Sequence, residues 1–235
     1  MDRAHQLRLL SRGDIDVRGR IVDSSNQALL VAVRLEGAEA LACYKAEAGE
    51  RPLWDFPGGL WRREVAAYEL DQLLGVDLVP PTVARDDAPF GPGSLQWWID
   101  GATDDHYFTL RDRDGFDPVA RALAVLDVVA NNADRKAGHV LFDGTRYWAI
   151  DHGLCFHRDD KLRTVLWEFA GEPVAPDLLA RVARVADGHT GALARWLSPE
   201  ELALTQWRAG ELVDAGVYPS PDEDGAWPPY PWPLI

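Results

Sequence analysis

The stretch from residue 131 to residue 156, "NNADRKAGHVLFDGTRYWAIDHGLCF", places charged side chains directly beside two apolar runs. The runs 139–142 and 147–150 are rich in β-forming residues, and the Asp-Gly pair in "DGTR" between them is a strong hairpin signal. The stretch therefore predicts two short strands, with Asp134 in the loop before them and Asp151 at their end. Ionisable groups gathered there would cost stability through desolvation and repulsion, so they indicate a ligand site.

The elements on either side of this stretch predict an α+β protein with two lobes. The expected strands are residues 18–22, 28–35, 40–46, 82–83 and 95–99, and the expected helices are 60–75, 118–131, 175–186 and 199–215. We predict a small β-rich N-lobe with one helix (1–100), a larger α-rich C-lobe (101–218) and a Pro/Trp-rich tail (219–235). An active site is expected between the lobes, and the tail is expected to fold back onto its own lobe and hide Trp227 and Trp232.

Composition and charge exclude several classes of function. The 235 residues are 47% hydrophobic and 26% charged, as in a folded globular protein, and the formal net charge is −14. This acidic balance argues against nucleic acid or an anionic membrane surface as the main partner. Cys43 and Cys155 lie in apolar runs, and no apolar run approaches the roughly 18 residues of a membrane span. We therefore expect a cytoplasmic protein without a membrane span.

Five ionisable residues follow one another in an order that suits phosphoryl transfer from ATP. That reaction needs a cation on the phosphates, acids that hold Mg²⁺ and a carboxylate that orients the acceptor. Lys45 ends the third strand, Glu64 lies in the following helix, and Asp134, His139 and Asp151 surround the hairpin. Each alone has an ordinary explanation as a solvated charge, a turn residue or a half-buried histidine. Their order along the chain favours a site.

The same segments resemble known kinases. "NNADRKAGHVL" and "AIDHGLCF" resemble the catalytic and metal loops of the phosphatidylinositol 3-/4-kinase-like superfamily, especially type II phosphatidylinositol 4-kinases. The helix "REVAAYELDQLLG" is similar to that of the secretory-pathway atypical kinases, and HipA-like kinases share the general plan. The chain as a whole resembles an actinobacterial family of small phosphatidylinositol-kinase-like proteins, mainly over residues 18–170.

The resemblance implies a role for each matching residue. Asp134 is expected to be the catalytic-loop aspartate, and Arg135 the basic residue that follows it. Asp151 is expected to bind Mg²⁺, Lys45 to contact the α- and β-phosphates, and Glu64 to hold Lys45 in place. The segment "QWWI" falls where such kinases join their lobes and present backbone groups to adenine. Its residues in the predicted nucleotide site are Gln96, Trp98 and Ile99.

Two positions depart from the kinase pattern. His139 replaces the metal-binding asparagine, and its ring nitrogen is a softer ligand, which favours Mn²⁺ beside Mg²⁺. The turn 23–27 contains no glycine, so it is not a Gly-rich phosphate loop. Ser24 and Ser25 in that turn are expected to donate hydrogen bonds to phosphate oxygens, and an ordinary polar hairpin is an equally good explanation.

The leading hypothesis is an ATP- and divalent-metal-dependent kinase that acts on a soluble acceptor, either a protein hydroxyl or a small molecule. A phosphoinositide substrate is disfavoured, because the chain is acidic and lacks a basic amphipathic helix. A second hypothesis is a catalytically silent nucleotide-binding scaffold, motivated by His139 and the glycine-free turn. A third is a metal-dependent hydrolase with Asp134, His139, Asp151 and His157 as ligands, which leaves Lys45 and Glu64 without a role.

Overall fold

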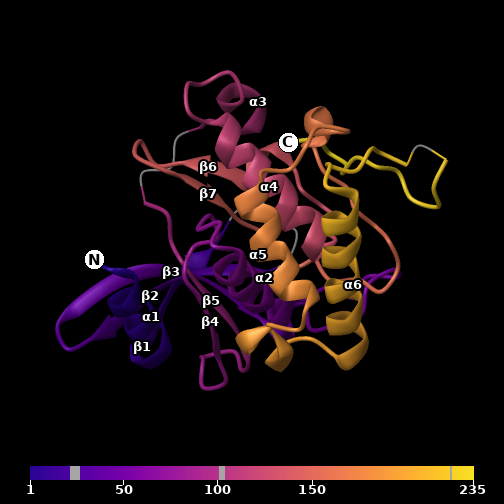
Figure 1. Cartoon of the computed structure of the whole chain (residues 1–235). Coiled ribbons are helices and arrows are strands. Elements are labelled where there is room, and N and C mark those ends of the chain that lie inside the picture. Colours follow the sequence, from indigo (N-terminus) through magenta and orange to yellow (C-terminus); the bar gives the residue numbers. More distant parts are fainter. Residues whose placement is uncertain (22–26, 101–103, 223) are drawn as a thin grey trace.

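A five-stranded antiparallel sheet forms the first half of the computed structural model, which describes residues 1–21, 27–100, 104–222 and 224–235 (Figure 1). The strands lie in the order β1-β2-β3-β5-β4. Their bounds are β1 Asp14–Arg20, β2 Ala28–Leu35, β3 Ala38–Ala46, β4 Thr82–Arg85 and β5 Gly93–Trp97. The first strand thus begins at Asp14, earlier than the sequence predicts, and pairs with β2 from Asp14↔Arg34 onward with a bulge between Val17 and Gly19.

A helix at the N-terminus, α1 (Arg3–Arg12), covers one face of this sheet and is absent from the sequence-based prediction. Asp2 caps it by accepting a hydrogen bond from the His5 N–H at 2.8 Å. Leu9 and Leu10 are fully buried against the sheet. Gly13 ends the helix at a close approach, because a Cβ there would lie 2.5 Å from Val33 Cγ1. The segment carries many charged residues, so its short apolar edge was not recognised as a helix signal in the sequence.

Helices and one short hairpin make up the second half of the chain. The helices are α3 Tyr107–Leu110, α4 Asp117–Ala130, α5 Pro176–Ala186 and α6 Pro199–Ala215, and the hairpin is β6 Val140–Phe142 with β7 Tyr147–Ala149. The hairpin turn is stabilised by Asp143, which accepts from the N–H groups of Thr145 and Arg146, both at 2.8 Å. The hairpin and the three long helices beyond the sheet confirm the predicted elements, with ends that agree to within one or two residues.

Helix α2 (Leu60–Leu74) joins the two halves. It contacts strands β4 and β5 as well as helices α4 and α5, and eleven of its fifteen residues are buried. Gly75 ends it in the left-handed conformation at φ 58°, where a residue without a Cβ is favoured. The helix that carries Glu64 is therefore fixed from both sides, so the Glu64 side chain has a defined place between sheet and helices.

The Pro/Trp-rich tail lies against the helical half, as expected. The Pro229 carbonyl accepts hydrogen bonds from the Thr164 N–H at 3.1 Å and from Trp167 Nε1 at 2.9 Å, and the Leu234 carbonyl accepts from the Ala137 N–H at 2.8 Å. The expectation that Trp232 is hidden is wrong, because its side chain is 88% exposed. Among the described residues, no helix is long and apolar enough to cross a lipid bilayer.

Candidate active site

Three elements bring Lys45, Glu64 and Asp151 together. Lys45 lies on β3, and its Nζ forms ion pairs with Glu64 Oε1 from α2 and, at 2.9 Å, with Asp151 Oδ1 just after β7. Glu64 is buried, and its second oxygen accepts from the His152 N–H at 3.1 Å. The three predicted residues therefore lie in direct contact although they are separated by up to 106 positions in the chain.

Strand alternation explains why Lys45 faces this cluster. Ala42, Tyr44 and Ala46 on β3 are buried in the apolar core beneath the sheet. Side chains point to alternate faces of a strand, so Cys43 and Lys45 share the opposite face, where both are half-buried. The pattern "ACYKA" thus places a thiol two residues before the ammonium group on one surface.

The charges of the cluster stabilise one another. Burial alone would lower the pKa of Lys45, but the carboxylates of Asp151 and Glu64 outweigh it and hold that pKa above its usual value. Burial would raise the pKa of Asp151, yet Lys45, followed by His139, brings it well below the ordinary range. Burial keeps the pKa of Glu64 raised. Asp151 is therefore an ionised carboxylate at neutral pH.

The backbone at Asp151 has an unusual conformation that orients its side chain. Its φ is 60°, in the left-handed region that a non-glycine residue rarely adopts. Such conformations cost on the order of 1–3 kcal/mol and persist where the surrounding structure determines them. Here the neighbouring N–H of His152 is held by Glu64, and the Ile150 carbonyl accepts from Arg135 Nη1 at 2.9 Å. The contacts on both sides fix the direction in which the Asp151 carboxylate points.

The loop that carries Asp134 is held by a buried network beneath it. Asn132 Oδ1 accepts from the Asp134 N–H at 3.0 Å, and Asn132 Nδ2 donates to Asp127 Oδ1 at 2.9 Å. The Asp134 carboxylate remains partly accessible, and burial raises its pKa, against the effect of Lys136. A carboxylate with a raised pKa is better suited to accept a proton near neutral pH.

Arg135, which was predicted as a catalytic residue, lies beneath the loop of Asp134 and not in the site above it. Its guanidinium is fully buried and faces inward, where Nε lies 2.9 Å from Asp127 Oδ2 and one Nη lies 2.7 Å from His152 Nε2. The rigid fork of an arginine matches a carboxylate in this way. Arg135 therefore positions the loop and does not face the space above Asp134.

Lys136 is a site residue that sequence reasoning missed. Its Nζ lies 2.8 Å from Asp134 Oδ2, and its side chain is mostly buried. The signal was available in the sequence, because a cation two residues after the catalytic-loop aspartate in an extended loop points to the same side. Lys136 places a positive charge beside the carboxylate that is expected to orient the acceptor.

His139 lies where the metal-binding asparagine is expected. It ends the short 3₁₀ turn Ala137–His139 just before β6, and its Nε2 lies 3.5 Å from Asp151 Oδ2. Burial lowers the pKa of His139 to about 4, against the effect of Asp151, so the ring is neutral at pH 7. Its Nδ1 lies 3.5 Å from the Lys136 backbone nitrogen. A neutral imidazole binds a metal ion through the nitrogen that carries no proton, so coordination at Nε2 requires the ring proton to be on Nδ1.

A divalent cation fits this pair of donors only with help from other ligands. Within the described residues, no three side chains of His, Cys, Asp or Glu come together as a metal site. Mg²⁺ in nucleotide sites typically uses one or two protein carboxylates and completes its shell with phosphate oxygens and water. The donor set Asp151 and His139 fits a metal of that kind.

The other residues predicted to bind nucleotide lie outside the cluster of Lys45, Glu64 and Asp151 or outside the described residues. The Gln96 side chain donates to Thr82 Oγ1 at 2.9 Å within the sheet, and the Trp98 N–H already donates to the Leu41 carbonyl at 3.1 Å. Those two groups are thus not free for adenine, and Ile99 is buried. Ser24 and Ser25 lie outside the described residues.

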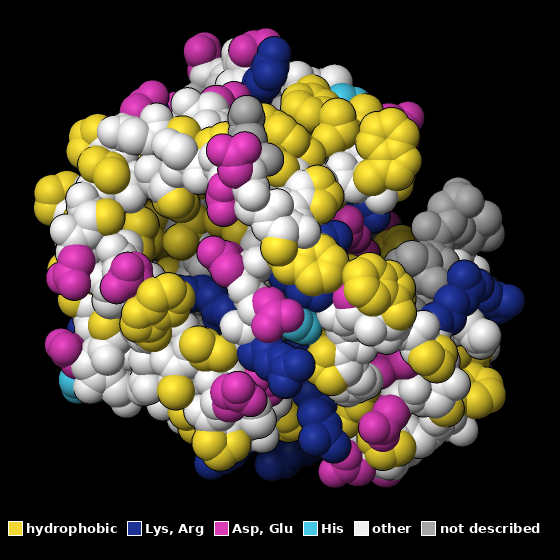
Figure 2. Space-filling model, turned by 90° about the vertical axis from the view of Figure 1, so that its right-hand side faces the viewer, with side chains coloured by type: hydrophobic (Ala, Val, Ile, Leu, Met, Phe, Trp, Pro, Cys, Tyr) yellow, Lys and Arg dark blue, Asp and Glu magenta, His cyan; other side chains and the backbone are white. Residues whose placement is uncertain are grey.

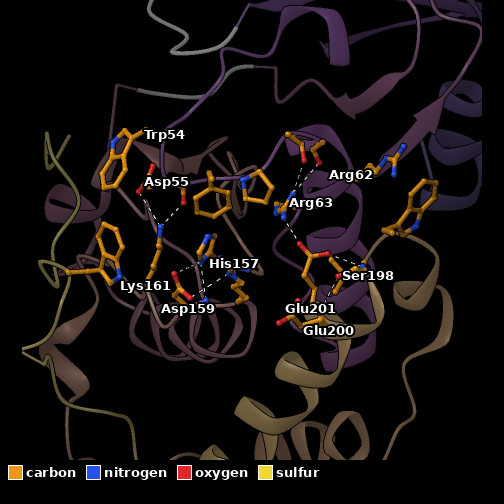
Figure 3. A pocket seen from close by; sticks show the side chains of 18 of the residues that line it. Trp54, Asp55, Arg62, Arg63, His157, Asp159, Lys161, Ser198, Glu200 and Glu201 are labelled. Atoms are coloured by element: carbon orange, nitrogen blue, oxygen red, sulfur yellow. Dashed lines mark hydrogen bonds and ion pairs between the residues drawn. The ribbon is translucent and has the colours of Figure 1, made fainter.

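The four-ligand set of the hydrolase hypothesis is not assembled. His157 packs against Phe56 with ring centroids 4.7 Å apart and the ring planes tilted by 50°. It lines another pocket (Figure 3), whose lining residues include none of Asp134, His139 and Asp151. The structure therefore favours the kinase-like arrangement over a hydrolase centre.

The lowered pKa of His139 makes a prediction about stability. Between pH 6.5 and about 4 an unfolded chain binds a proton at this residue and the folded chain does not, so acidification favours unfolding. We expect His139→Asn to remove up to about 1.4 kcal/mol per pH unit from the acid dependence of the unfolding free energy. Urea unfolding of metal-free protein at several pH values measures this slope. The matched variant His189→Asn, at an exposed position, should keep the wild-type slope, and an unchanged slope in His139→Asn would contradict the assignment.

Comparison with known proteins agrees with this geometry. No family model matches the chain. The chain is 40% identical to Protein Rv2133c of Mycobacterium tuberculosis, over 97% of this chain and 94% of that protein. The chain belongs to the family of that protein. Over 59% of its own length, the chain is also 30% identical to phosphatidylinositol 4-kinase gamma 4 of Oryza sativa subsp. japonica, and this match spans only 29% of that larger protein.

Two solved kinase structures show the fold of this Rv2133c family member. A structure of hydra Fam20 with sugar superimposes with a TM-score of 0.57 at 12% identity. The match covers 89% of this chain and 86% of the Fam20 chain. The crystal structure of the Golgi casein kinase has a TM-score of 0.52 at 12% identity, and the match covers 94% of this chain and 79% of the casein kinase chain. The fold is thus the two-lobed fold of atypical kinases, which confirms the predicted fold class. The closer kinship with phosphatidylinositol kinases stays a prediction.

Proposed function

We propose that this protein is a kinase that transfers the γ-phosphoryl group of ATP to a non-membrane acceptor, with Mg²⁺ or Mn²⁺ as cofactor. The observation that carries this proposal is the contact of Lys45 with both Glu64 and Asp151, because these residues come from three separate elements. A lysine between two acids on a sheet, a helix and a strand end is the arrangement that kinases use to hold ATP phosphates and their metal ion. The lobe division at residues 100/101 is part of the same proposal.

Each residue has a task in the proposed reaction. Lys45 binds phosphate oxygens of ATP while Glu64 keeps its ammonium group in place. Asp151 and His139 would hold the divalent cation, which would supply positive charge to neutralise the phosphates. Asp134 accepts the proton of the acceptor hydroxyl while the oxygen of that hydroxyl forms a bond to Pγ. The bond from Pγ to the β,γ-bridging oxygen breaks at the same time, and ADP leaves. Lys136 places its charge beside the reacting groups.

Arg135 acts from below as a positioning residue. It ties the loop of Asp134 to Asp127 and to the Ile150 carbonyl, next to Asp151. The general base and the metal-binding carboxylate are therefore held by one guanidinium. The tail contributes to the same support, since the Leu234 carbonyl binds the Ala137 N–H in the turn that leads to His139.

The experiment that tests the proposal is thermal unfolding with and without ATP plus Mg²⁺ or Mn²⁺. A ligand that binds only the folded state raises its stability by mass action, by about 2.7 kcal/mol at a concentration of 100 times Kd. We expect a metal-dependent rise in Tm for wild type that is lost in Asp151→Asn. Asp214→Asn, an exposed residue near the end of α6, is the matched control and should respond like wild type. No rise at millimolar nucleotide with either metal would refute the proposal.

A further inference from the structure

A pocket between α6 and the Pro/Trp-rich tail has no part in the reaction proposed above. Its volume is about 800 Å³, in the range typical of small-molecule sites. Its walls come chiefly from one face of α6, the segment 159–162, Trp167 and the residues 217–222 and 225–229. We call it the Trp207 pocket, after the indole that α6 contributes. Figure 2, which faces α6 and the tail, shows a hollow with hydrophobic side chains in its floor and acidic side chains at its edge.

Helix α6 supplies two neighbouring side chains that are suited to hold one ligand. Trp207, Glu211 and Ala215 line the pocket at intervals of four residues, which places them in one row along the helix. Residues four apart on a helix have Cβ atoms only about 5–6 Å apart. The Trp207 side chain is 56% exposed, and Glu211 is exposed as well. An indole ring and a carboxylate therefore lie side by side at this pocket.

The charge that the Trp207 pocket presents to a ligand is negative. All four of its carboxylate side chains are exposed, namely Asp159, Asp160, Glu211 and Asp222. Among the described residues Glu211 has no partner for an ion pair, whereas Asp177 at the start of α5 pairs with Arg181 at 3.2 Å. The carboxylate beside Trp207 is therefore available to a cation that enters the pocket.

The two cationic side chains of the lining are directed into the protein. Lys161 is 1% exposed, and its Nζ lies 3.2 Å from Asp55 Oδ2. Arg208 is 7% exposed, and its Nη2 donates to the His157 carbonyl at 2.7 Å. The Nε and Nη1 atoms of Arg208 are buried too, without an acceptor among the described residues. A molecule in the pocket thus meets exposed carboxylates, while both cations are covered by protein atoms.

Indole rings form a large part of the same lining. Trp167, Trp207 and Trp227 come from three separate segments. Trp167 Nε1 donates to the Pro229 carbonyl at 2.9 Å, which fixes the direction of its ring. The Trp227 ring already carries a cation, since Lys161 Nζ lies 4.0 Å from its centre. The face of an indole attracts cations through its quadrupole, so rings of this kind beside exposed carboxylates favour a positively charged ligand.

We propose that the Trp207 pocket binds a small organic ammonium ion with an apolar body. The positive charge lies against the Trp207 ring beside the Glu211 carboxylate, and the apolar body lies against the leucines of the lining, Leu162 and Leu212. The inference does not rest on the proposed kinase function, because no residue of the proposed catalytic cluster lines this pocket.

Binding is tested with three probes of similar size and with no nucleotide or metal. Benzyltrimethylammonium carries a positive charge, benzyl alcohol carries none, and benzoate carries a negative charge. We expect benzyltrimethylammonium to shift the indole N–H resonance of Trp207 in ¹H–¹⁵N NMR spectra, identified as the signal that Trp207→Leu lacks. Benzyl alcohol should bind at least about 10-fold more weakly and benzoate not at all. Equal binding of the cation and benzyl alcohol would overturn the proposal. Tighter binding of benzoate would also overturn it and would assign the site to Arg208.

Variants locate the site. Trp207→Leu should raise the Kd for benzyltrimethylammonium about 10-fold and Glu211→Gln about 5-fold, as expected for one lost cation–π contact and one lost carboxylate partner. Both side chains are exposed, so both variants should keep the wild-type Tm. Trp54→Leu and Glu200→Gln change exposed side chains outside this pocket and should bind like wild type. Wild-type affinity in both Trp207→Leu and Glu211→Gln would overturn the proposal. Loss of binding in Asp151→Asn would place the cation at the proposed active site and would overturn it as well.

Discussion

Asp134→Asn is expected to reduce phosphoryl transfer by a factor of about 10² to 10⁴, the usual contribution of a positioned general base. The asparagine keeps the shape of the side chain and the hydrogen bond that the Asp134 N–H donates to Asn132, but it cannot accept the acceptor proton. The loss should therefore appear in kcat, with little change in the KM for ATP. Steady-state formation of ADP in the presence of a cell extract that supplies the acceptor measures both quantities.

The same variant separates an active kinase from a silent scaffold. Its metal-dependent Tm shift with ATP should equal that of wild type, because Asp134 does not contact Lys45 or Glu64 in any described interaction. Asp214→Asn provides the matched carboxylate-to-amide control and should keep full activity. Equal rates in Asp134→Asn and wild type, with nucleotide binding intact in both, would favour the scaffold hypothesis over the kinase.

Arg135→Met is expected to lower the unfolding free energy by about 3–5 kcal/mol, because it leaves the Asp127 carboxylate buried without its cation. Arg135 is 0% and Asp127 1% exposed, so water cannot replace the lost partner. The Ile150 carbonyl also loses a hydrogen-bond donor at 2.9 Å. Urea unfolding at pH 7 gives the free energy directly.

Two further variants show whether the charge pair is the cause. The double variant Asp127→Leu/Arg135→Met buries neither charge alone and should recover part of the loss. Arg8→Met removes a guanidinium that pairs with Glu36 on the surface, with half or more of each side chain exposed, and should cost less than about 1 kcal/mol. A cost for Arg135→Met as small as that for Arg8→Met would contradict the assigned network.

Local signals in the sequence predicted the hairpin and helix α2 well. The Asp-Gly turn at residues 143–144 and the helix end at Gly75 are each decided by a few neighbouring residues, so pattern and spacing suffice. The pairing of Lys45 with Glu64 was expected from the resemblance and the order of the residues, and the structure brings the two together. The contact of Lys45 with Asp151 was not predicted. Their catalytic roles stay predictions.

Features that depend on long-range packing could not be predicted in the same way. Helix α1 has an apolar edge of only a few residues and forms because Leu9 and Leu10 meet the sheet. The inward direction of Arg135 depends on Asp127, a residue that the sequence presents only as part of a helix. The pocket shown in Figure 3 joins residues 54, 161, 195 and 227, and no local pattern connects positions so far apart.

The position of Cys43 has a practical consequence for chemical labelling. Cys43 shares the Lys45 face of β3 and is half-buried, while Cys155, the other cysteine, is fully buried. Burial raises the pKa of the Cys43 thiol to about 11, so little thiolate meets a reagent in free solution at neutral pH. An electrophile attached to a nucleotide analogue at Lys45 would be held beside this thiol at high effective concentration. Cys43 is therefore suited to selective labelling by a covalent probe that is directed to Lys45 by its nucleotide part.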